Sequence, residues 1–187
     1  MSIKNNLKID NEYIWKNIPK SIKTLHNIFN SNNKNLYLVG GSIRDLIIGN
    51  IPIDYDLCTN ANPDEIINIL KLNNYEYSIQ GKSFGVVVVY TSDQPSGIEI
   101  VTFRTDIYNE HTKTPRIIFT NIEDDVMRRD IRINGLYYDL NEKVVIDLVG
   151  GIEDLKNNVI SMIGDPNRRI EEDPLRILRV LRMSSRF

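Results

Sequence analysis

A short apolar strand that runs directly into a glycine pair is the feature that most constrains the fold of this chain. The segment Leu36 to Val39 is followed by Gly40, Gly41 and Ser42, at the start of a predicted helix that also carries Arg44. Glycine lets backbone N–H groups approach an anion closely, and a helix N-terminus attracts negative charge. The sequence therefore predicts a strand–turn–helix unit that holds phosphate groups, with a plain tight turn as the alternative.

Paired carboxylates follow this turn in a second predicted strand, Ile53 to Leu57, as Asp54 and Asp56. Side chains two residues apart on an extended strand project from one face, so both carboxylates can share divalent cations. Solvated turn acids are the alternative, but the phosphate-binding pattern just before them favours a metal site and phosphoryl or nucleotidyl transfer. Glu99, in a predicted strand from Ile98 to Phe103, is a candidate third metal ligand or an outward-facing glutamate.

Two further polar clusters lie on predicted helices. Asn121 is predicted to cap a helix that runs to about Tyr138 and carries Arg128, Arg129, Asp130 and Asn134. Residues 130 and 134 would share a face there and suit a ribose and phosphates, although basic pairs on helices are usually solvated. A final helix from about Glu171 carries the row Asp173, Arg176, Arg179 and Arg182. This row can read the edge of a nucleobase or form a salt-bridged surface.

The rest of the chain predicts ordinary elements. These are an amphipathic helix from Tyr13 to Phe29, a helix from Asn62 or Pro63 to Leu72, a hairpin of Val86 to Tyr90 with Ile98 to Phe103, a mobile loop from Thr105 to Thr120, and a strand from Val144 to Leu148.

Composition narrows the setting. The formal net charge is -2, so a nucleic-acid partner would have to bind a local basic patch. Cys58 is the only cysteine, which excludes an internal disulfide and suits a reducing compartment. The chain shows no targeting pattern at its start and no stretch that is long and apolar enough to cross a membrane. We therefore expect a cytoplasmic protein without a membrane partner.

Taken in order, the clusters resemble the class II tRNA nucleotidyltransferase and bacterial poly(A) polymerase family. The matching segments are Leu38 to Asp45 with Asp54 and Asp56, Glu99 to Arg104, Arg128 to Asn134, Asp147 to Gly151, and Glu172 to Arg182. The resemblance implies an α+β fold: a polymerase-β-like nucleotidyltransferase head with a mixed sheet flanked by helices, over residues 36–165. An N-terminal helical arm over residues 1–35 precedes it, and the first helix of an α-helical neck, residues 166–187, follows it.

The resemblance also implies a role for each cluster. Asp54 and Asp56 would be catalytic and hold two Mg²⁺ ions, with Glu99 as a further candidate ligand. Gly40, Gly41, Ser42 and Arg44 would bind the triphosphate of ATP or CTP, and Arg128, Arg129, Asp130 and Asn134 would bind its ribose and phosphates. Asp173, Arg176, Arg179 and Arg182 would select the nucleobase. The implied reaction is template-free addition to an RNA 3′ end, most commonly that of tRNA, with release of pyrophosphate.

Two departures from the family pattern leave alternatives open. Arg132 adds a charge beside the ribose cluster, and family members continue into helical body and tail regions, supplied here either in the same chain or by a partner chain. The turn from Gly81 to Gly85 resembles the CCA-adding branch, whereas Asn134 to Asp139 and Ile163 to Arg168 also resemble poly(A) polymerases. We favour CCA addition as the commoner role. The alternatives are poly(A) synthesis, a non-catalytic nucleotide- or RNA-binding module, and a different acceptor.

Overall fold

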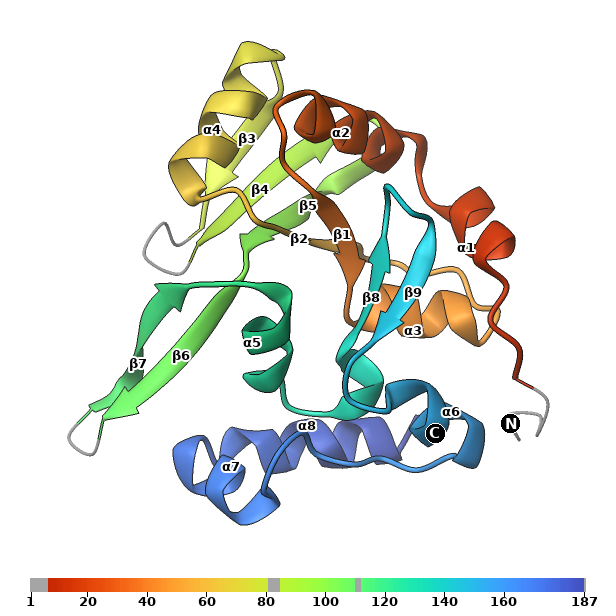
Figure 1. Ribbon diagram of the computed structural model, residues 1–187, viewed down its shortest axis with the longest axis vertical. Helices are drawn as coiled ribbons and strands as arrows, with labels where there is room; N and C mark the ends of the chain where they lie inside the picture. The colour runs from red at the N-terminus through yellow and green to blue at the C-terminus, as the bar shows by residue number, and fades with distance from the viewer. Residues whose placement is uncertain (1–6, 81–84, 110–111, 187) are drawn as a thin grey trace.

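A seven-stranded mixed sheet forms the centre of the computed structural model, which describes residues 7–80, 85–109 and 112–186 (Figure 1). Its strands, in spatial order, are β3 (Glu76–Ile79), β4 (Val86–Thr91), β5 (Gln94–Thr102), β2 (Asp56–Thr59), β1 (Leu36–Val39), β8 (Leu136–Asp139) and β9 (Val144–Asp147). The pair β2 and β5 is parallel and the other neighbours are antiparallel. This mixed sheet with flanking helices confirms the expected α+β class.

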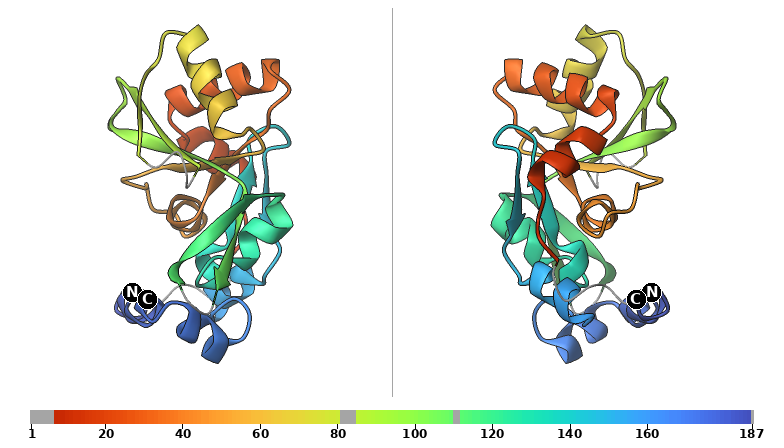
Figure 2. Two further views of the ribbon diagram at one scale, coloured as in Figure 1. Left: turned by 90° about the vertical axis from the view of Figure 1, so that its left-hand side faces the viewer. Right: turned by 90° about the vertical axis from the view of Figure 1, so that its right-hand side faces the viewer.

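Helices cover both faces of the sheet. The elements are α1 (Asn11–Asn17), α2 (Lys20–Ser31), α3 (Gly41–Ile47), α4 (Pro63–Leu72), α5 (Ile122–Met127), α6 (Gly151–Asn157), α7 (Pro166–Glu172) and α8 (Leu175–Ser184). Alternation along β1 separates two cores: Leu36 and Leu38 pack with α1 to α4, whereas Tyr37 and Val39 pack on the opposite face with α5. Helices α7 and α8 lie together at one end of the molecule (Figure 2). Among the described residues, no helix is long and apolar enough to cross a membrane.

Locally encoded elements form as predicted. Asn62 caps α4 with a full capping box, in which Glu65 bonds back to the Asn62 N–H, and Pro63 occupies the first turn. The predicted hairpin forms as β4 and β5, and the predicted strand near the end forms as β9. The turn from Gly81 to Gly85 lies outside the described residues except for Gly85 itself.

Two predicted helices are interrupted, and both breaks have a local cause. Pro19 lacks the N–H that a continuous helix needs, so the segment from Tyr13 to Phe29 forms α1 and α2 instead of one helix. The final helix likewise divides into α7 and α8, since Asp173 is extended and Pro174 opens α8.

The predicted helix from Asn121 to Tyr138 is wrong beyond its first turns. Asn121 caps α5 as expected, but α5 ends at Met127, a 3₁₀ turn η2 (Arg132–Asn134) follows, and β8 begins at Leu136. Ile131 instead pairs with Met162 in an isolated β-bridge. Residues 130 and 134 therefore do not share a helical face.

The predicted mobile loop from Thr105 to Thr120 is also wrong. This segment forms a two-stranded hairpin of β6 (Arg104–Asn109) and β7 (Thr112–Phe119), separate from the main sheet. Its strands pair with each other outside the main core, so its side chains show little of the apolar periodicity that marks a core strand.

The segment Asp147 to Gly151 has a structural role. The Asp147 carboxylate accepts hydrogen bonds from the N–H groups of Val149, Gly150, Gly151 and Ile152, which fixes the turn into α6. A Cβ atom at Gly151 would lie 2.3 Å from the Arg132 carbonyl oxygen, so only glycine fits there. Arg132 itself points to this turn, with Nη1 3.9 Å from Asp154 Oδ1, and does not line the pocket described below. The position of Arg132 therefore does not support the expectation that it adds a charge beside the ribose cluster.

Candidate functional site

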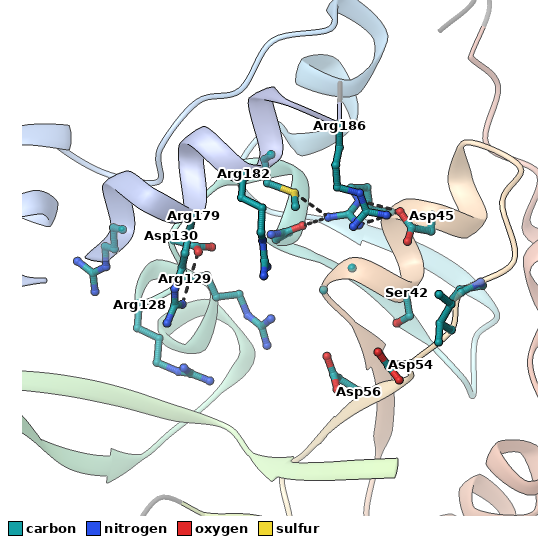
Figure 3. Close-up of a pocket in the computed structure, with 18 of the residues that line it drawn as sticks. Ser42, Asp45, Asp54, Asp56, Arg128, Arg129, Asp130, Arg179, Arg182 and Arg186 are labelled. Atoms are coloured by element: carbon teal, nitrogen blue, oxygen red, sulfur yellow. Dashed lines mark hydrogen bonds and ion pairs between the residues drawn. The ribbon is translucent and has the colours of Figure 1, made fainter. Parts of the chain in front are cut away.

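A pocket of about 900 Å³ lies between the sheet, the end of α5 and helix α8 (Figure 3). Eight arginines and six aspartates line it, so the cavity is strongly polar. It contains every residue of the predicted glycine turn, carboxylate pair, arginine–aspartate cluster and α8 row, and it leaves out Glu99. The four clusters, spread from residue 40 to residue 182, thus meet at one site.

The carboxylate pair lies on the floor of this pocket. Asp56 begins β2, and Asp54 precedes the strand in a bend, so the prediction that both lie within one strand is wrong. Both carboxylates nevertheless point toward the space below the α8 arginines (Figure 3). Loss of water around the Asp56 carboxylate raises its pKa to about 6; repulsion from Glu99 and Asp54 adds to the rise, and Arg129 opposes it. A divalent cation would relieve this repulsion.

Glu99 lies where the predicted arrangement needs it. Its strand β5 is the parallel neighbour of β2, and Glu99 is in register with Asp56. However, within the described part of the chain no three His, Cys, Asp or Glu side chains are grouped to hold a metal. Glu99 is therefore not grouped with the two aspartates as a third metal ligand, and metal binding by Glu99 stays a prediction.

The glycine turn lines the pocket, and two of its donors are bonded within the protein. Gly40 has φ +71°, and a Cβ there would lie 3.8 Å from Arg129 Nη1 and 4.0 Å from Asp56 Oδ2. The absent side chain therefore keeps the space between a guanidinium and a carboxylate open. The Gly40 N–H donates to the Leu136 carbonyl and the Ser42 hydroxyl donates to the Val39 carbonyl, so both of these donors are engaged within the protein and contact of the turn with an anion stays a prediction.

Arg44 is buried at the centre of the site. Its Nε and Nη2 donate to Asp45 Oδ1 at 2.9 and 2.8 Å, and its Nη1 donates to Asn134 Oδ1 and to Met183 Sδ. These contacts join α3 to η2 and α8. Arg44 therefore holds three walls of the pocket together, and its direct contact with a triphosphate stays a prediction.

The carboxylate of Asp125 organises the arginine pair. It is fully buried, and it accepts from Arg128 Nη2 at 2.8 Å, Arg129 Nη2 at 3.0 Å, the Tyr137 hydroxyl at 2.7 Å and the Arg104 N–H at 3.0 Å. Burial would raise its pKa, but Arg129 and Arg128 outweigh burial and hold the pKa below its ordinary value. The sequence offered a signal for this role, since Asp125 precedes the two arginines by three and four residues on a helix.

The α8 row enters the pocket from above, but its first members are engaged within the protein. Arg176 is buried and donates to Glu172 Oε2 and to the Arg169 carbonyl, while Asp173 accepts the Leu175 N–H. Arg179 lies 3.6 Å from Asp130 Oδ2, and Arg182 reaches toward the cavity (Figure 3). The structure thus brings the row to the site, while reading of a nucleobase stays a prediction.

Sequence reasoning missed several residues of the lining. Arg104 and Asp106 enter from β6, most of which was expected to be a loop, and Arg186 lies just beyond the end of α8, four residues after Arg182. The four-residue spacing from Arg182 was the signal for Arg186.

Arg169 connects the two halves of the pocket. Its Nη2 donates to the carbonyl oxygens of Arg128 and Arg129, and its Nη1 donates to Glu172 Oε2 at 2.7 Å. Because Glu172 also holds Arg176, this side chain fixes α7 and α8 to the arginine pair.

Replacing Arg169 with alanine should therefore loosen the two helices. Each lost hydrogen bond to a charged group is worth about 1.5 to 3 kcal/mol, so amide exchange across α7 and α8 should accelerate roughly 10-fold or more. Hydrogen–deuterium exchange measures this. Arg168→Ala is the matched control, since Arg168 also bonds Glu172 but its side chain is 81% exposed. Equal protection of the helices in both variants would contradict the proposed link.

Comparisons with known proteins agree with this geometry. Residues 36–161 match the model of the family described as the poly A polymerase head domain. The chain is 38% identical over 165 residues to poly(A) polymerase I of Salmonella typhi, and the match covers 81% of this chain and 34% of that protein. It is 39% identical over 154 residues to the CCA-adding enzyme of Lactobacillus helveticus, covering 81% and 37%.

A solved structure gives the same picture. The Bacillus stearothermophilus CCA-adding enzyme in complex with CTP superimposes with a TM-score of 0.75 at 28% identity, covering 86% of this chain and 37% of that one. The chain thus spans about a third of the length of the curated relatives it matches.

Proposed function

Because the chain belongs to the poly(A) polymerase head domain family, we propose that it is the catalytic head of an enzyme that adds nucleotides from ATP or CTP to an RNA 3′ end. Pyrophosphate would be the second product. The convergence of the carboxylate pair, the glycine turn and the arginine-rich walls on one pocket is the observation that carries this proposal. In domain terms, residues 36–165 form the head, residues 1–35 the arm and residues 166–187 the start of a neck.

The donor set of the pocket floor fits magnesium. Mg²⁺ commonly binds through one or two carboxylates together with substrate phosphates, which is what Asp54 and Asp56 beside an anion pocket offer. Burial is the main cause of the raised pKa of Asp56, and the neighbouring Glu99 and Asp54 carboxylates add to it, which supports a cation beside this carboxylate. Two bound Mg²⁺ ions would activate the attacking hydroxyl and neutralise the leaving pyrophosphate.

The residues of the chain supply binding, orientation and charge. Gly40 and the Arg129 guanidinium lie close to Asp56, so the glycine turn and Arg129 suit the triphosphate. Asp125 fixes Arg128 and Arg129 in place before substrate arrives, which lowers the cost of ordering them. Asp130 and Asn134 lie beside them for the ribose, and the α8 row would face the nucleobase.

Product analysis tests the proposal and separates its two forms. The purified chain would be incubated with Mg²⁺, labelled ATP or CTP, and tRNAs that lack the terminal A or the whole CCA. We expect CTP and then ATP to be added and synthesis to stop after CCA. Long tails made from ATP alone would identify poly(A) synthesis, for which the nearly equal identities to the two kinds of relative leave room.

A helical body supplied in the same chain or by a partner would extend the grip on RNA, because the relatives are about three times as long as the matched part. Metal-dependent nucleotide binding without any incorporation, even with such a body added, would indicate a non-catalytic binding module. It would overturn the enzymatic proposal.

A further inference from the structure

The loop that leads into the carboxylate pair carries the most exposed apolar side chain of the described residues. Ile53 is 88% exposed and Ile51 is 60% exposed, and both line the pocket together with Asn50 and Pro52. The other described lining residues are almost all charged or polar, apart from glycines and the buried Met183. One wall of an otherwise ionic pocket is therefore apolar and open to water.

Two hydrogen bonds and a buried proline hold this loop in place. The Asn50 N–H donates to the Asp45 carbonyl at 2.8 Å, and the Tyr13 hydroxyl donates to the Gly49 carbonyl at 3.2 Å. Pro52 is buried, which anchors the middle of the loop between the two exposed isoleucines. The apolar wall is thus a fixed feature of the pocket, directly before Asp54.

We propose that Ile51 and Ile53 form the platform for the terminal nucleoside of the acceptor RNA, an inference that rests on the proposed nucleotide transfer. The attacking 3′ hydroxyl must lie beside Asp54 and Asp56, while the polyanionic nucleotide requires the arginine-lined walls. The wall that remains next to the carboxylates is the apolar loop. A ribose and the flat face of a base are the uncharged parts of an RNA end, and they match an isoleucine surface.

The same geometry gives a second consequence. Isoleucine offers no hydrogen bond to a base edge, so the platform accepts any terminal base. That property suits an enzyme whose product becomes the next acceptor. Arg186, which lines the same pocket just beyond the end of α8, supplies positive charge for the last phosphates of the RNA.

Substitution at Ile53 tests the platform in the full chain. Ile53→Asn should raise the KM for acceptor RNA by about 5- to 10-fold, while kcat at saturating acceptor and the KM for the nucleotide stay within about twofold. Ile53→Met should restore acceptor binding because it restores apolar contact. Leu72→Asn is the matched control, since Leu72 is 69% exposed on α4 and does not line the pocket.

The outcomes separate this inference from the proposed function. An unchanged acceptor KM in an active Ile53→Asn variant would overturn the platform alone. A change in nucleotide KM instead would assign the wall to the incoming nucleotide and would also overturn it. Wild-type chain that binds nucleotide yet adds nothing to any RNA would overturn the proposed function itself.

Discussion

Replacing Asp56 with asparagine is expected to lower the rate constant of nucleotide addition by about 10³-fold or more, because an amide cannot supply the negative charge that binds a catalytic cation. The fold should survive this change. The pKa of Asp56 is raised to about 6, so above that pH its charge opposes folding in metal-free protein. Single-turnover addition to a labelled RNA measures activity, and thermal melting in the presence of a chelator measures stability.

For Asp56→Asn, lost activity together with an undiminished melting temperature would show that the carboxylate serves catalysis and not folding. Asp64→Asn, an exposed aspartate in the first turn of α4, is the matched control and should leave activity unchanged. Glu99→Gln reports on the third carboxylate: a loss of about 10-fold or more would make Glu99 a ligand, and no loss would make it an outward-facing glutamate. Wild-type activity in Asp56→Asn would show that the metal site is assigned wrongly.

The second large effect is expected at Asp125. Its replacement by alanine leaves two guanidiniums and the Tyr137 hydroxyl without their buried acceptor, which should lower the free energy of unfolding by about 3 to 5 kcal/mol. Urea titration at neutral pH measures this. Asp124→Ala is the matched control, because its carboxylate is exposed and accepts a hydrogen bond from the Thr120 hydroxyl. Equal stability of the two variants would remove Asp125 from the centre of the arginine cluster.

The same site has a defined dependence on pH. Because the arginines hold the folded pKa of Asp125 below its ordinary value of 3.8, its contribution is fully present above that value. It is lost as the pH falls through the lower folded pKa. The stability difference between wild type and Asp125→Ala should therefore shrink only in strong acid, which urea titrations at a series of pH values would reveal.

Elements with a local cause could be predicted from the sequence, and elements with a distant cause could not. The strand before the glycine turn and the capping box of α4 depend on neighbouring residues, and both are present. The hairpin of β6 and β7 depends on pairing between two polar strands, so the periodicity around Pro115 suggested a loop. The spacing of the apolar residues near Ile131 is compatible with a helix. In the structure they form β8 and the bridge to Met162 instead, and both depend on partners that are distant in the sequence.

The site shows the same division. Its members could be identified from motifs, because each motif is short and ordered. The contacts among them could not, since Arg44 was predicted to bind the triphosphate and nothing in the sequence indicated that it would also be buried against partners from η2 and α8. Burial of an arginine needs acceptors, and the sequence between them gives no sign of which segments will supply them.

Arg44 also imposes an order on biosynthesis. Its partners Asn134 and Met183 lie 90 and 139 residues further along the chain, so a ribosome must release almost all of α8 before this guanidinium is fully enclosed. Until then a nascent chain can form the sheet and display its carboxylates, but the pocket has no roof. The pocket should therefore become complete only once α8 has been synthesised, and a product that stops before α8 would carry the acidic pair without the means to hold a nucleotide over it.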